Sequence, residues 1–65
     1  MKYVVVQRTG FLPYFLSSWG DGTDRWDCHV DQACVFNGPA ARRIAEQLNN
    51  SNPGRVVPVT VETIR

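Results

Sequence analysis

Cys28, His29 and Cys34 are the residues whose side chain chemistry best suits metal binding or nucleophilic catalysis. Structural zinc has four ligands in a tetrahedron, usually supplied as two closely spaced pairs. The spacing here is Cys-His-x4-Cys without a second pair, and adjacent residues of a strand point to opposite faces of a sheet. We therefore expect no metal site. Buried structural cysteine is the favoured interpretation, and a Cys28–Cys34 disulfide is the main alternative.

Cys28 and His29 could also serve as a nucleophile and its base. Such a pair further needs a group that orients the histidine and a site that stabilises the oxyanion. The chain has a single histidine and only 65 residues, which leaves little room for a substrate pocket of about 300–1,000 Å³. We predict that the protein is not an enzyme and that it has no cofactor.

Acidic residues are concentrated in one short segment. Four of the six lie between positions 21 and 31, where only Arg25 opposes them, so four negative charges and one positive charge give −3 locally on a chain of net charge +1. A calcium loop would need oxygen ligands at alternate positions, which this spacing does not provide. One interpretation is a solvated hairpin whose aspartates serve turns and caps. The other is an acidic protein-binding surface that consists of Trp19, Asp21, Asp24, Trp26, Asp27 and Asp31.

Trp19 and Trp26 bracket an Asp-Gly turn at positions 21 and 22. Asp-Gly between two apolar segments is a strong hairpin signal. At least one of the two indoles is expected in the core, because a small sheet needs a large apolar side chain. The other could be exposed and act as an interface anchor.

One helix is predicted after position 37. Asn37 is a suitable N-cap and Pro39 fits the first turn. Small and aliphatic residues then recur at helical spacing, so that they share one face: Ala40, Ala41, Ile44, Ala45 and Leu48. Asn49 and Asn50 can adopt the left-handed conformation that ends a helix. Ile44 and Leu48 should hold this helix to a sheet, and Arg42 and Arg43 should lie on its solvated face.

Extended segments are predicted on both sides of the helix. The valine-rich run 2–8 suits a central strand, and Pro13 marks an edge or the start of the second strand near Tyr14. A third strand is expected over 25–30, with a possible continuation over 33–36 after a bulge, and the last strand over 56–64. The resulting order is β-β-β-α-β. We predict one α+β domain over residues 1–65, in which one helix packs on a mostly antiparallel sheet of three or four strands whose other face is partly bare.

Length and composition exclude several classes of protein. The chain has no apolar run of about 18 residues, which argues against a membrane span. Its net charge of +1 argues against a general nucleic-acid binder. The apolar run near Met1 is too short for a signal peptide, so a cytoplasmic protein with reduced cysteines is expected.

Most of the chain resembles small orphan proteins that are encoded in bacteriophage and prophage genomes. The resemblance rests on a strand containing Trp26, on Ala33-x-x-Phe36, on the helical pattern Ala41-x-x-Ile44-Ala45-x-x-Leu48 and on a final valine-rich strand. Some members of this group, including anti-CRISPR proteins, block host machinery by covering a surface. No residue role can be transferred, because anti-CRISPR proteins share no common motif.

The resemblance implies a non-catalytic inhibitor or interaction module that binds a host protein complex, such as a Cas effector or another nucleic-acid-handling complex. It would act as a monomer or weak homodimer in the host cytoplasm, without contacting nucleic acid or membrane. An acidic surface could compete with nucleic acid for a basic groove. The alternatives are a small nucleic-acid-binding protein that stacks bases on Phe11, Tyr14 or Phe15, and a structural homodimer.

Overall fold

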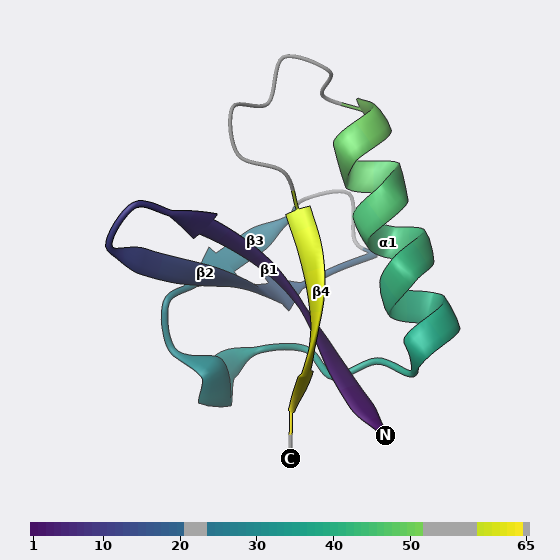
Figure 1. Cartoon of the computed structure of the whole chain (residues 1–65), viewed down its shortest axis with the longest axis horizontal. Coiled ribbons are helices and arrows are strands. Elements are labelled where there is room, and N and C mark those ends of the chain that lie inside the picture. Colours follow the sequence, from purple (N-terminus) through teal and green to yellow (C-terminus); the bar gives the residue numbers. More distant parts are fainter. Residues whose placement is uncertain (21–23, 52–58, 65) are drawn as a thin grey trace.

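The computed structural model describes residues 1–20, 24–51 and 59–64 (Figure 1). The elements, in order, are β1 (Lys2–Thr9), β2 (Leu12–Ser18), β3 (Arg25–Asp27), the short 3-10 helix η1 (Val30–Gln32), α1 (Gly38–Ser51) and β4 (Val59–Ile64). The predicted α+β fold, with one helix on an antiparallel sheet, is confirmed. The first part of the expected last strand, 56–58, lies outside the described residues.

The sheet has the strand order β3-β2-β1-β4, and all neighbours are antiparallel. β1 is central and β4 lies beside it, as the valine run predicted. Gly10 joins β1 to β2 with a φ of 72°, a conformation that glycine adopts at little cost. Pro13 lies inside β2 opposite Arg8, in a stretch to which β3 does not pair. Its missing N–H is therefore not needed for a ladder with β3.

α1 covers one face of the sheet and forms the larger part of the core there (Figure 1). Its buried residues are Gly38 and four of the five residues of the predicted apolar stripe, namely Ala41, Ile44, Ala45 and Leu48, whereas Ala40 is only partly buried. They pack with Val5, Leu16 and Val59 from three neighbouring strands. The helix face that was predicted from residue spacing is thus confirmed.

The other face of the sheet is not as bare as expected. Val4, Val6 and Phe15 are buried there, and Ala33 and Ile64 pack against them. The chain after β3 returns along the sheet: the Cys34 N–H donates to the Leu16 carbonyl at 2.9 Å. Phe15 is therefore unavailable for stacking on a nucleic-acid base.

Two predictions about the segment between β3 and α1 were wrong. The third strand ends at Asp27 rather than Val30, and the chain then forms η1. Residues 33–36 do not continue a strand; only Phe36 pairs, through two hydrogen bonds of 2.9 Å with Tyr3. β2 reaches only as far as Val6 along β1, and Phe36 occupies the vacant pairing position farther along β1.

α1 begins as predicted but ends later. The Ala40 N–H donates to Asn37 Oδ1 at 2.8 Å, which confirms the N-cap. The helix runs on to Ser51, and no described residue other than glycine has a positive φ, so Asn49 and Asn50 do not form the predicted left-handed end. The Asn49 side chain is instead hydrogen-bonded to the backbone of Val59, which favours a helical Asn49.

Candidate functional site

Asp27 ends β3 and folds the chain back on itself. Its carboxylate oxygen Oδ1 accepts the backbone N–H of His29 at 2.8 Å and lies 2.9 Å from Nδ1 of the same residue. A carboxylate that bonds to the backbone two residues ahead is a common turn device. The backbone hydrogen bond, and to a lesser degree the side chain of His29, lower the pKa of Asp27 below its usual value, so the group is held as a carboxylate.

The same turn brings Cys28 and His29 to one side of the chain. Cys28 Sγ lies 3.5 Å from His29 Nδ1, and the donor atoms of Asp27, Cys28 and His29 all lie within 4.8 Å of one another. The expectation that Cys28 and His29 point to opposite faces was wrong, since strand geometry stops at Asp27. We call these three residues the Asp-Cys-His turn.

The cysteines differ from the favoured interpretation as well. Cys28 and Cys34 are both free and only partly buried, so neither is a fully buried core residue and the alternative disulfide is not formed. Cys34 is fixed by its backbone N–H bond to Leu16. The group of potential metal ligands found among the described residues does not include Cys34.

The aspartates of the predicted acidic surface come from different parts of the fold. Asp24 precedes β3, Asp27 ends it and Asp31 lies in η1. Asp24 and Asp31 are exposed, and Asp27 serves the turn. Asp21 lies outside the described residues. Two of the predicted charges are therefore available to a partner, and a third has a structural task.

Trp19 and Trp26 are both partly buried and pack against the core beneath α1. Trp26 lies opposite Leu16 in the pairing of β2 with β3. The expectation that at least one tryptophan belongs to the core is confirmed. Neither is a freely exposed anchor, because both rings are partly buried against that core.

Three exposed apolar side chains lie close together in sequence at the end of the β1–β2 hairpin. Phe11 is fully exposed, Leu12 is 51% exposed and Tyr14 is 37% exposed. Leu12 and Tyr14 pair with Thr9 and Gln7 and share the sheet face on which α1 lies, but the hairpin extends away from the helix (Figure 1). We call Phe11, Leu12 and Tyr14 the hairpin tip. The sequence indicated Phe11 and Tyr14 only as possible stacking residues.

The comparisons with known proteins add no functional assignment to this geometry. No family model, curated protein or solved structure matches this chain. Within the described residues, no helix combines the length and apolar character that a membrane crossing demands. The Asp-Cys-His turn and the hairpin tip therefore have to be judged by their own chemistry.

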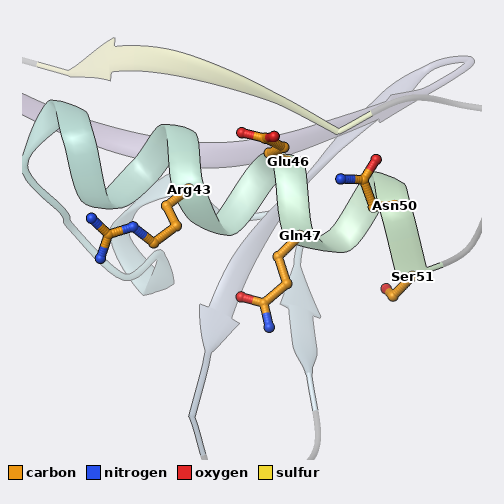
Figure 2. Close-up of a pocket in the computed structure, with 5 residues that line it drawn as sticks. All are labelled: Arg43, Glu46, Gln47, Asn50 and Ser51. Atoms are coloured by element: carbon orange, nitrogen blue, oxygen red, sulfur yellow. The ribbon is translucent and has the colours of Figure 1, made fainter.

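A hollow of about 550 Å³ lies along the outer side of α1, lined by Arg43, Glu46, Gln47, Asn50 and Ser51. Figure 2 shows that these side chains point away from the helix in different directions rather than toward one centre. A ligand site needs polar groups that converge. We interpret this region as the solvated helix face that the positions of Arg42 and Arg43 predicted.

Proposed function

We propose that this protein is a non-catalytic interaction module that binds a host protein through its hairpin tip. The observation that carries the proposal is the exposure of Phe11, Leu12 and Tyr14 next to one another in the β1–β2 hairpin. Exposed aromatic residues are favoured anchors of protein interfaces. Contiguous apolar residues on a small protein's surface are also a known mark of binding sites.

The hairpin presents these side chains on a firm support. The two strands are paired from Val6↔Phe15 to Thr9↔Leu12, and Thr9 Oγ1 donates to the Leu12 carbonyl at 3.4 Å. The base of the hairpin is anchored by the buried residues Val6 and Phe15. A support that is already ordered reduces the entropy lost on binding.

A protein partner is favoured over nucleic acid by the charge on the hairpin. Single-stranded nucleic acid is bound by aromatic stacking combined with a positively charged groove. The cation nearest the tip on β1, Arg8, makes two hydrogen bonds of 2.8 Å to the carboxylate of Glu62. Its charge is thus offset, and the tip offers aromatic rings without a free cation beside them on the strand.

The inhibitor function that the phage resemblance implies is one form of this proposal. The hairpin tip would enter an apolar cleft on a host complex and obstruct it without chemistry. Exposed Asp24 and Asp31 lie apart from the hairpin tip, and they would favour a partner that carries positive charge elsewhere on its surface. A Cas effector or another nucleic-acid-handling complex would be such a partner, because it must carry positive charge to bind phosphates.

A pull-down from bacterial lysate with paired variants tests the proposal. The Phe11→Ser/Tyr14→Ser double variant should lose a captured protein that the wild type retains. The control is Val30→Ser, which removes an apolar side chain that is 50% exposed from η1, outside the hairpin tip. A protein captured equally by both variants would overturn the proposal. Sedimentation of the purified chain tests the homodimer alternative, and retention on single-stranded DNA tests the nucleic-acid alternative.

A further inference from the structure

We infer that Asp27, Cys28 and His29 form a binding site for one zinc-class divalent cation. The inference rests on the Asp-Cys-His turn alone and does not depend on the hairpin tip. Three different ligand types converge there: a carboxylate, a thiol and an imidazole, with all donor atoms within 4.8 Å. They are consecutive in sequence, and the backbone turn after β3 brings them together.

Two of the three ligand separations are close to those around a tetrahedral ion. With metal bonds of about 2.3 Å to sulfur and about 2.0–2.1 Å to nitrogen or oxygen, the edges of a tetrahedron measure roughly 3.3–3.6 Å. The observed separation of Cys28 Sγ and His29 Nδ1 is 3.5 Å, which is already such an edge. The separation of Asp27 Oδ1 and His29 Nδ1 is 2.9 Å. That contact is a hydrogen bond, and it must lengthen by roughly 0.4 Å for both atoms to bind one ion.

The proton balance of binding follows from the same contacts. The Cys28 thiol must lose its proton, because the thiolate is the metal ligand. His29 must bind as the tautomer that carries its proton on Nε2, since Nδ1 becomes the ligand atom. The His29 side chain is 73% exposed, so its Nε2–H can donate a hydrogen bond to water. The backbone N–H of His29 already bonds to Asp27 and can keep the carboxylate oriented.

The ligand set selects the class of ion. Thiolate and imidazole favour zinc and similar transition metals, whereas calcium and magnesium prefer sites built from oxygen alone. Three protein ligands leave the fourth position open, as in zinc sites that accept water or an incoming ligand. The turn lies at the end of the edge strand β3, so the open position is accessible to solvent or to a side chain of a bound partner.

Cobalt(II) titration of the reduced 65-residue chain tests the site. A tetrahedral cobalt thiolate gives a charge-transfer absorption band, which should saturate at one metal per chain. Cys28→Ser should abolish the band, and His29→Gln should weaken binding by about tenfold or more. Cys34→Ala is the matched control, because it removes the other free cysteine, and it should bind like the wild type. No band at saturating cobalt, or loss of the band in Cys34→Ala, would overturn the inference.

Asp27→Asn separates the metal ligand from the turn. The amide oxygen can still accept the His29 backbone N–H, so the turn should persist while the negative charge is lost. Zinc should shift the imidazole NMR signals of His29 in the wild type, and it should do so only at higher zinc concentration in this variant. Identical zinc titrations of the two proteins would remove Asp27 from the site and overturn the three-ligand assignment.

Discussion

Asn49 in α1 makes two hydrogen bonds to the backbone of one residue, Val59, at the start of β4. The Val59 N–H donates to Asn49 Oδ1 at 2.8 Å, and Asn49 Nδ2 donates to the Val59 carbonyl at 3.0 Å. The amide thereby pairs with the strand much as another strand would. It fixes where β4 begins relative to the end of the helix, and both groups are partly buried.

We predict that Asn49→Ala lowers the free energy of unfolding by about 1–3 kcal/mol, since each lost hydrogen bond contributes roughly 0.5–1.5 kcal/mol. Asn49→Asp should be at least as damaging, because it replaces the donor with an acceptor that faces the Val59 carbonyl. Asn50→Ala is the control on the exposed side of the same turn. Urea denaturation measures all three, and equal stability of the Asn49 and Asn50 variants would contradict the role of this clamp.

We predict that Ile44 and Leu48 hold α1 to the sheet. Both are buried, at 7% and 3% exposure, and truncation of such residues to alanine costs about 2–5 kcal/mol. For a domain whose total stability is about 5 kcal/mol, Leu48→Ala should leave a large unfolded fraction. Arg43→Ala, on the exposed face, should not. Similar small effects from the three substitutions, measured by thermal melting, would refute the packing described above.

We predict that a strong chelator does not lower the melting temperature, because the core is built from apolar packing on both faces of the sheet. Added zinc should raise the melting temperature, because a ligand at 100 times its Kd stabilises the folded state by up to roughly 2.7 kcal/mol. The stabilisation should be smaller than this value, because Asp27, Cys28 and His29 are adjacent in sequence and can also bind zinc in the unfolded chain. Cys28→Ser should remove the effect. A loss of many degrees on chelation would mean that metal is needed for folding.

We predict that the exposed aspartates influence the rate of partner association more than stability. Asp24→Asn and Asp31→Asn together should leave the melting temperature nearly unchanged, as both side chains are exposed. The association rate with a positively charged partner should fall, and its dependence on salt should weaken, because charges are screened over about 8–10 Å. Stopped-flow kinetics at two ionic strengths measure this. An unchanged rate and salt dependence would show that these charges only solvate the surface.

Much of the scaffold could be predicted because its signals are local. The valine run of β1, the Asn37 cap and the spacing of Ala41, Ile44 and Leu48 each determine structure within a few residues. The prediction failed where a side chain found its partner elsewhere. Asparagine is a residue type that often ends a helix. The hydrogen bonds of Asn49 to Val59, ten residues away, instead favour a longer helix.

The candidate sites were also mispredicted where contacts outside the local sequence pattern decide the structure. The prediction continued the alternating side-chain directions of a strand beyond Asp27. In the structure the strand ends there, where the Asp27 side chain accepts a hydrogen bond from the His29 backbone N–H. Cys28 and His29 were therefore assigned to opposite faces. Leu12 and Tyr14 are exposed although they share the sheet face on which α1 lies, because the hairpin extends away from the helix (Figure 1). No pattern within residues 11–16 contains that information.

The central position of β1 has a consequence for folding kinetics. Its register with β4 joins Lys2 to Ile64 and Gln7 to Val59, so the first strand completes its ladder only with the last one. The chain between β1 and β4 must lose conformational entropy before the two strands can pair. Contacts between residues so far apart in sequence therefore slow folding. The β1–β2 hairpin and α1 can form early from local contacts, but β1 keeps one unpaired edge until β4 has been synthesised. During translation that edge is a strand-pairing surface without its partner, which makes the nascent chain prone to intermolecular pairing.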